Sequence, residues 1–250
     1  MNATIRDAVR WLAGVKSLVV LTGAGVSKES GIPTFREAQD GLWAQYDPME
    51  MASQEGFLRN PGLVWSWYEY RFGMVLSAQP NAGHQAIADL EQLFPSVTVV
   101  TQNIDGLHTA AGSTHVLELH GSIRRYKCLS GRHADYSLAD FVDQAEKPPR
   151  CPECGDIIRP DVVWFGEYLP ESTLQHAYEA CLRCEAMLVV GTSGVVQPAA
   201  SLPRLATRAG AMVIDVNPEE DEIAMTADLF LKGKGGKVLP QLVAALRAQR

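Results

Sequence analysis

The sequence predicts an α/β fold, in which a doubly wound, parallel, Rossmann-like sheet carries a smaller inserted lobe. Six short apolar runs typical of buried strands recur along the chain, at residues 17–22, 97–101, 116–119, 186–191, 211–216 and 228–231. Helix-patterned stretches separate several of these runs. An alternation of this kind is typical of a parallel sheet covered by helices.

The predicted helices have apolar residues three and four positions apart, which places these side chains on one face. The first covers residues 2–13, before the first strand, and the others cover 61–77, 84–93, 172–183 and 238–248. Pro61 suits a first helical position, because its ring fixes φ and its missing N–H would have no partner there.

Two segments interrupt the alternation. Residues 42–80 are rich in aromatic side chains and Met, and residues 122–160 are polar and carry three cysteines. We interpret these two segments as a small lobe inserted into a large lobe that consists of residues 1–41, 81–121 and 161–250. On this interpretation the whole chain, residues 1–250, is a single domain.

Composition excludes several classes of protein. The longest apolar runs, such as 18–21 and 187–190, are far shorter than the ~20 residues that span a bilayer. The N-terminus lacks a secretory pattern, so we expect a cytoplasmic protein without membrane contacts. The net charge of −7 argues against nonspecific nucleic-acid binding. The five cysteines are expected to be thiols or metal ligands.

A glycine-containing turn follows the first predicted strand. Gly23 and Gly25 permit a tight turn and the approach of backbone N–H groups to a pyrophosphate. Lys28 occupies the place of the third glycine of the common dinucleotide fingerprint, and no acidic residue ends the second strand. These departures argue against a hydride-transferring dehydrogenase. An ordinary strand-to-helix turn is the alternative.

Polar residues follow the next two strands as well. The loop 101–108 contains Asn103, Asp105 and His108, which could bind a ribose and a carboxamide. His120 and Gly121 follow the third strand. An isolated His is more often structural, although its ordinary pKa of about 6.5 suits a general base.

In order, spacing and identity, segments 23–36, 101–108, 120–121, 191–193 and 216–217 resemble the sirtuin family over nearly the whole chain. The resemblance implies a single catalytic domain that uses NAD to remove acyl groups from lysine in proteins or peptides. Nicotinamide, free lysine and O-acyl-ADP-ribose would be the products. It implies His120, as the general base, and Asn103 as catalytic residues.

The resemblance also implies a set of NAD-binding residues: Gly23, Ala24, Gly25, Ser30, Gly31, Phe35, Arg36, Gln102, Asn103, Asp105, Gly191, Thr192, Ser193, Asn217 and Gly235. The glycine-rich segment 233–236 matches the family region that closes over adenine. The alternative is a flexible connection before the last helix, since Gly is common in turns.

Tyr68 and Arg71 lie three residues apart on a predicted helix and therefore share a face. The pair resembles the class III sirtuins, which accept succinyl and malonyl lysine, because Arg can bind an acyl carboxylate bidentately and Tyr can donate to it. Alternatively, Arg71 is solvated and Tyr68 only packs. Segment 161–167 resembles the family's substrate-pairing strand. Further implied substrate residues are Ala52, Ile104, Val163, Phe165, Gly166 and Glu167.

The structural zinc site of the family has two Cys-x-x-Cys pairs. Cys151 and Cys154 form one pair, but Cys128 is followed by Gly131 where the fourth Cys is expected, so this ribbon-like segment is degenerate. His133 could take the place of that ligand, or the metal could be lost. Cys181 and Cys184 are expected to pack as small apolar side chains.

Two other functions are alternatives, and the first would use the same nicotinamide-releasing site. An ADP-ribosyltransferase would transfer ADP-ribose to a protein side chain, and a noncatalytic module would only sense NAD. Neither needs an anchor for an acyl carboxylate, so Tyr68 and Arg71 favour deacylation. The oligomeric state and the protein substrates are left open.

Overall fold

The structure is a computed structural model that describes residues 3–34 and 46–249. Of the predicted cofactor-binding residues, Phe35 and Arg36 lie outside this part of the chain.

The large sheet has six parallel strands in the order β3-β2-β1-β6-β7-β8. Their bounds are β1 (Ser17–Thr22), β2 (Ser96–Thr101), β3 (Val116–Glu118), β6 (Ala186–Val190), β7 (Met212–Asn217) and β8 (Leu229–Lys232). All six predicted strands are confirmed, with ends that move by one residue at most. The chain leaves β1 toward one edge of the sheet and β6 toward the other, so the strand order reverses between them.

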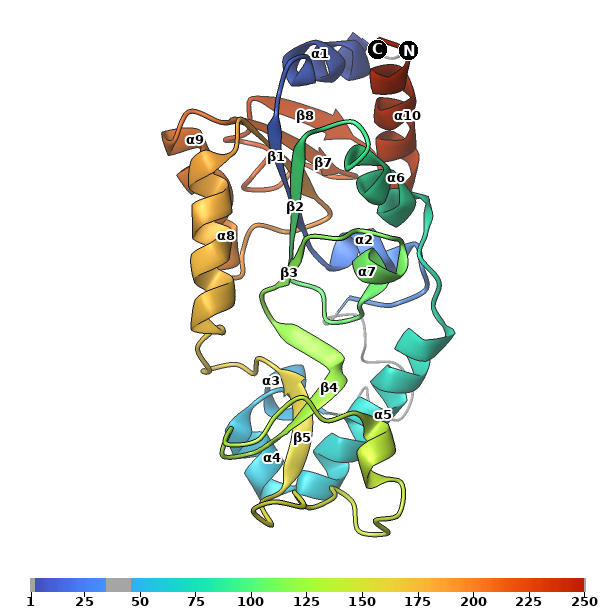
Figure 1. Cartoon of the computed structure of the whole chain (residues 1–250), viewed down its shortest axis with the longest axis vertical. Helices are drawn as coiled ribbons and strands as arrows, with labels where there is room; N and C mark the ends of the chain where they lie inside the picture. Colours follow the sequence, from blue (N-terminus) through green and yellow to red (C-terminus); the bar gives the residue numbers. More distant parts are fainter. Residues whose placement is uncertain (1–2, 35–45, 250) are drawn as a thin grey trace.

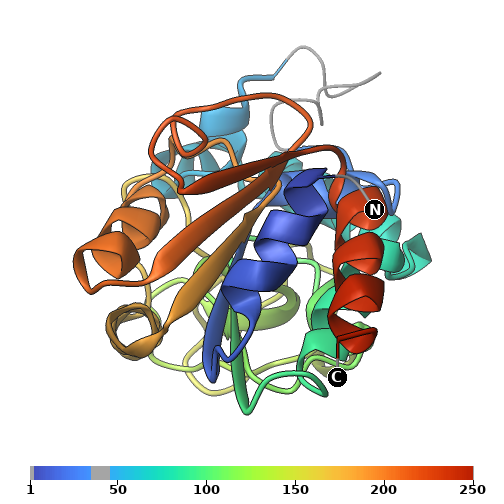
Figure 2. The same ribbon diagram turned by 90° about the horizontal axis from the view of Figure 1, so that it is seen from above.

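Helices cover both faces of this sheet (Figure 2). Alternate strand residues point to opposite faces, so that Val20 and Leu188 join one apolar cluster while Val19 and Met187 join another. On the first face lie α1 (Ala3–Leu12), α6 (Ala82–Leu90) and α10 (Gly235–Arg247); on the second lie α8 (Glu171–Arg183) and α9 (Leu202–Arg208). The doubly wound architecture is therefore confirmed.

A second, smaller group of elements lies at one end of the molecule (Figure 1). It contains α3 (Pro48–Met51), α4 (Gln54–Arg59), α5 (Pro61–Ser77), the antiparallel pair β4 (Gly121–Cys128) and β5 (Ile158–Val162), and the 3-10 turn η2 (Leu138–Phe141). Two further apolar clusters form its interior. The remaining elements are α2 (Ala24–Lys28), α7 (Leu107–Ala110) and η3 (Ala199–Ser201).

The helix α5 has the predicted bounds because its first turn is well capped. The Asn60 side chain accepts a hydrogen bond from the Leu63 N–H, and Pro61 occupies the first helical position. By contrast, α10 begins at Gly235, three residues before the predicted start. Two glycines make its first turn, and the poor helix propensity of glycine hid this turn from the prediction. No helix in the described ranges is long and apolar enough to cross a membrane.

The loops after β1 and β6 meet backbone to backbone at the point where the strand order reverses. The Gly25 N–H donates to the Gly191 carbonyl oxygen at 2.8 Å. A Cβ on Gly25 would lie 2.7 Å from that oxygen, and a Cβ on Gly191 would lie 2.6 Å from the Val26 nitrogen. Gly191 also has a φ of +60°, which favours glycine. Side chains cannot enter this contact without moving the backbone.

Replacing Gly25 by Ala should therefore destabilise the fold by about 1–3 kcal/mol, the usual cost of overpacking. Gly73→Ala is the matched control, since Gly73 lies in α5 with no described atom within 4 Å of a Cβ. In a helix, Ala at this position should stabilise by up to about 1 kcal/mol. Denaturant midpoints measure both effects, and equal midpoints for the two variants would contradict the packing argument.

Candidate active site

The predicted site residues gather beyond the carboxyl ends of the parallel strands. Asn103 and Asp105 follow β2, His120 follows β3, Thr192 follows β6, and Asn217 ends β7. The reversal of strand order lies between β1 and β6, and open α/β sheets bind ligands in the crevice at such a point. The fold thus brings residues from separate motifs to one edge of the sheet.

A buried hydrogen-bond network joins the loop after β2 to the loop after β1. The Asn103 amide donates to the Gly23 carbonyl and to the Ser27 hydroxyl, both at 3.0 Å. The Ser27 hydroxyl in turn donates to the Asp105 carboxylate at 2.8 Å. The other Asp105 oxygen accepts from the Leu107 N–H at 2.8 Å. Asn103 and Asp105 are therefore held in fixed orientations before any ligand binds.

Ser27 and Arg124 contribute to this network but were missed by the sequence analysis. Arg124 donates through Nε to the carbonyl oxygen of Asp105 at 3.0 Å. Ser27 is buried, and its hydroxyl both accepts and donates within the network. Its position within the segment that begins at Gly23 was the available signal, whereas nothing local pairs Arg124 with Asp105.

The loops after β6 and β7 are tied to the same edge. The Gln102 amide donates to the Thr192 hydroxyl at 2.8 Å. The Asn217 amide donates to the Thr192 carbonyl and to the Asp221 carboxylate, both at 2.9 Å. Ser193, next in the chain, is exposed. These contacts bring three of the sequence-predicted residues, Gln102, Thr192 and Asn217, together around the end of β6.

His120 has the geometry of a base. Its Nδ1 lies 3.0 Å from the Gln102 carbonyl oxygen, which can only accept, so Nδ1 carries the proton and Nε2 keeps its lone pair. Burial lowers the pKa of His120, and the bond to the Gln102 carbonyl opposes that shift in part. The imidazole is thus neutral at neutral pH and ready to accept a proton.

The other predicted cofactor residues flank this edge. Ala24 begins α2, and the hydroxyl of Ser30 accepts from the Asn81 amide at 2.9 Å. Gly31 has a φ of +84° in the turn after α2. A Cβ on Gly235 would lie 3.1 Å from the Val190 side chain, so the start of α10 packs closely on β6. The neighbouring Gly236 N–H donates to Glu29 at 2.9 Å, so this segment belongs to a packed helix start.

Tyr68 and Arg71 share the inner face of α5. Their exposed fractions are 4% and 9%, so the alternative of a solvated Arg71 is wrong. The Arg71 guanidinium lies 5.0 Å from the centre of the Trp67 ring. Burial lowers the pKa of Arg71 and raises the pKa of Tyr68 to about 12. At neutral pH the phenol therefore stays protonated and can donate.

The segment 161–167 is paired within the chain over only part of its length, and its expected pairing with a substrate stays a prediction. β5 ends at Val162, Phe165 makes a single parallel bridge with Ser53, and Gly166 turns the chain with a φ of +85°. The Phe165 N–H donates to the Ala52 carbonyl at 2.8 Å, and the Val163 N–H donates to the His120 carbonyl at 2.9 Å. These bonds hold the segment between His120 and Ala52.

Glu167 and Ile104 are also placed near this segment, but by different contacts. Glu167 accepts from the Trp164 N–H at 2.9 Å and pairs with Arg159. Ile104 packs against the apolar cluster that contains Tyr68 and Trp164.

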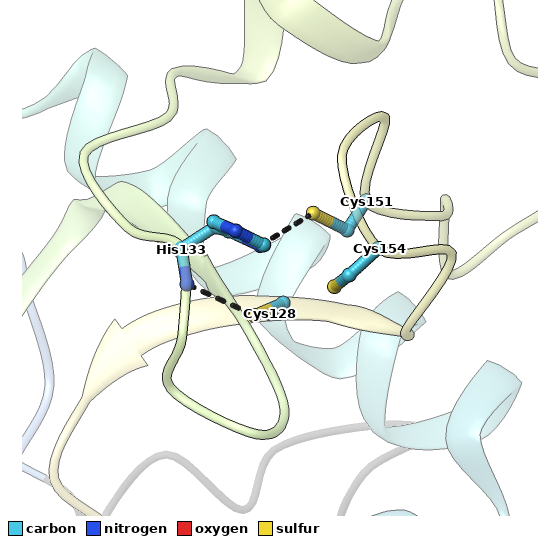
Figure 3. A group of neighbouring side chains, drawn as sticks. All are labelled: Cys128, His133, Cys151 and Cys154. Carbon is cyan, nitrogen blue, oxygen red and sulfur yellow. Dashed lines mark hydrogen bonds between the residues drawn. The ribbon is translucent and has the colours of Figure 1, made fainter.

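Cys128, His133, Cys151 and Cys154 converge at the end of β4, with their ligand atoms within 4.8 Å of one another (Figure 3). A tetrahedral zinc site with bonds of about 2.0–2.3 Å requires ligand atoms roughly 3.3–3.8 Å apart, so small adjustments suffice. Three thiols and an imidazole fit Zn²⁺, and His133 takes the place of the expected fourth Cys. Gly131 forms the turn between β4 and His133 with a φ of +71°. Cys181 and Cys184 are buried in the apolar core, as expected.

The arrangement as a whole defines a class of protein: an enzyme that binds a dinucleotide across the ends of a parallel sheet. Bare glycine backbone at Gly23 and Gly25, next to the fixed Asn103 and Asp105, fits a pyrophosphate and a ribose. Residues 23–198 match the model of the Sir2 family. The chain belongs to the Sir2 family.

Known relatives and structures agree with this assignment. The NAD-dependent protein deacylase 1 of Pseudomonas aeruginosa is 49% identical over 245 residues, covering 96% of this chain and 98% of its own. A Sir2 homologue in complex with NAD is 45% identical with a TM-score of 0.90, and the match covers 98% of this chain and 94% of that one. Sir2Af2 bound to a myristoylated histone peptide is 40% identical with a TM-score of 0.79, and both chains are covered fully.

We expect the purified protein to hold one zinc ion per chain. His133→Ala and Cys154→Ala should each lose most of the metal and lower the melting temperature, because a structural zinc site needs all four ligands. Cys181→Ala, in the core away from this cluster, should keep it. Metal analysis by mass spectrometry measures the content, and full zinc in the His133 variant would refute its role as a ligand.

Proposed function

We propose that this NAD-dependent protein deacylase removes succinyl and malonyl groups from lysine and also acts on acetyl lysine. The observation that carries the proposal is the pair Tyr68 and Arg71, a protonated phenol and a guanidinium buried on one helix face. The substrates would be acylated lysines in proteins or peptides. The products would be nicotinamide, free lysine and O-acyl-ADP-ribose.

The surroundings of Arg71 and Tyr68 favour an acyl group that ends in a carboxylate. The guanidinium of Arg71 lies in a part of the protein with little water, where a carboxylate is attracted far more strongly than at the surface. An Arg can hold such a carboxylate through two parallel hydrogen bonds, and Tyr68 can donate a third. The methyl end of an acetyl group offers neither bond.

Space and access for the acyl chain are consistent with this proposal. Ala52 is buried in the same apolar cluster as Tyr68, and its small side chain would leave more room for an acyl chain than a larger residue would. Phe165, Val195 and Val196 have exposed fractions of 42%, 52% and 42%, which provides an apolar surface for the peptide and the lysine stem. The peptide would lie between residues 163–167 and 194–196, where the large and small lobes adjoin.

The residues at the strand ends would perform the chemistry. When bound, NAD supplies the ribose that accepts the acyl group as nicotinamide departs. Asn103 and Asp105, fixed through Ser27, would orient that ribose. His120 would remove a proton from a ribose hydroxyl through the free lone pair of Nε2. Gln102 both anchors His120 through its carbonyl and bonds Thr192, so the base and the β6 loop share one support.

Replacing His120 by Ala should lower kcat by about 10²–10⁴-fold, the usual contribution of a general base, while NAD binding persists. The base must be neutral to act, and burial lowers its pKa. In the unaltered protein, kcat/KM should therefore stay constant from pH 8 down to about 6.5, the ordinary His value, and fall only below it. A decline that begins above pH 7 would contradict this assignment. Circular dichroism over the same range controls for unfolding.

Arg71→Met should lower kcat/KM for a succinyl-lysine peptide by about 10- to 150-fold, equivalent to about 1.5–3 kcal/mol for a bond to a charged group. The loss for a matched acetyl-lysine peptide should be much smaller, because only the carboxylate contact is removed. Arg59→Met is the control, since Arg59, at the end of α4, forms exposed ion pairs with Glu50 on α3 and with Glu55 on α4.

Mass spectrometry of both products with the two peptides decides the outcome. O-Succinyl-ADP-ribose from the unaltered protein and its selective loss in Arg71→Met would support the proposal. Equal losses on both peptides would contradict the acidic-acyl role of Arg71. ADP-ribosylated protein without O-acyl-ADP-ribose would instead identify an ADP-ribosyltransferase.

A further inference from the structure

Trp164 connects the segment 163–167, which would pair with the substrate, to Tyr68. Its indole N–H donates to the Tyr68 hydroxyl oxygen at 2.8 Å, and both side chains are buried. An indole can only donate, so the phenolic oxygen is the acceptor in this bond. The hydroxyl group then keeps its own hydrogen for a different partner.

The indole itself is held firmly on one face. The Arg159 guanidinium lies 3.3 Å from the centre of the Trp164 ring, and Arg159 is only 2% exposed. Arg159 is fixed in turn by an ion pair with Glu167 and by a 2.6 Å bond to the Val162 carbonyl. Glu167 also accepts from the Trp164 backbone N–H, so the same carboxylate holds both Arg159 and the backbone of Trp164.

A second ring restricts the indole as well. The Phe57 ring centre lies 5.1 Å from that of Trp164, with the planes tilted by 46°. Contacts with a guanidinium and an aromatic ring leave the indole little freedom to rotate. Its N–H is therefore held in place toward the Tyr68 oxygen.

We propose that Trp164 is a positioning residue for acidic acyl groups: its indole N–H occupies the Tyr68 oxygen and thereby directs the phenolic hydrogen to the acyl carboxylate beside Arg71. A hydroxyl hydrogen rotates to suit its partners, so the direction of donation depends on what the oxygen accepts. The inference rests on the proposed function and assigns it a residue beyond Tyr68 and Arg71.

The test is a double-mutant cycle on the selectivity for succinyl over acetyl peptide. Trp164→Phe keeps an aromatic ring under Arg159 but removes the indole N–H. It should lower the ratio of the two kcat/KM values by about 3- to 10-fold, the range of one neutral hydrogen bond. In a Tyr68→Phe background, the same change should lower the ratio no further, because the hydroxyl it positions is gone.

Trp65→Phe is the matched control. Trp65 lies on α5 and, like Trp164, is buried. Its indole N–H has no hydrogen-bond partner among the described residues, and its ring packs against Tyr126. The same loss of ring size there should leave the selectivity ratio unchanged. A merely structural role of Trp164 would lower both activities together and leave the ratio near its original value.

The outcomes separate the inference from the proposed function. A protein that does not turn over succinyl lysine would overturn both. Turnover of succinyl lysine by the unaltered protein, with an unchanged ratio in Trp164→Phe or with fully additive losses in the double variant, would overturn the inference alone.

A measurement on the unaltered protein applies if Trp164→Phe does not fold. The indole ¹⁵N–¹H signal of Trp164 should shift when succinyl-lysine peptide is added and shift less with acetyl-lysine peptide, because its acceptor forms a new bond in one case only. Equal shifts with both peptides would overturn the inference.

Discussion

The contact between the backbones of Gly25 and Gly191 is the constraint on which the rest of the site depends. It joins the loops after β1 and β6 where the strand order reverses, and neither residue has room for a Cβ. The loop after β1 is also held from the side of β2, because the Asn103 amide donates to the Gly23 carbonyl and to the Ser27 hydroxyl. A side chain at the contact would separate the loops, and the polar network would lose its support.

The smaller group of elements buries two arginines, Arg159 and Arg71, in different surroundings. Arg159 is compensated within the protein, since Glu167 pairs with it and the Trp164 ring lies beneath it. Arg71 lies beside the Trp67 ring, and under the proposed function its guanidinium would bind the carboxylate of the acyl group. A buried charge is costly unless it is paired. Under the proposed function, Arg159 stabilises the structure and Arg71 would serve recognition.

The sequence could predict the large sheet because each of its strands is a short, mostly apolar run, and the central strands β1, β6 and β7 are buried along nearly their whole length. β4 and β5 were missed, since their polar residues alternate irregularly and pairing shifts between Ser122 and Tyr126. The motifs predicted which residues gather at the strand ends. Ser27 and Arg124 could not be found that way, because their roles depend on the approach of loops distant in sequence. Burial of Arg71 likewise depends on how α5 packs, which helix spacing alone does not fix.

The cysteine cluster and the apolar cluster that contains Tyr68 and Trp164 share structural supports. Cys128 ends β4, which pairs with β5, and β5 leads directly into Trp164. On α5, Trp65 packs into the apolar cluster with Cys128 and Cys151, while Tyr68 packs into the cluster with Trp164. One strand pair and one helix therefore join both sites. A metal held by the three thiols and His133 would stabilise the strand pair that leads to Trp164. Loss of the expected fourth Cys would then be tolerated because His133 completes the cluster.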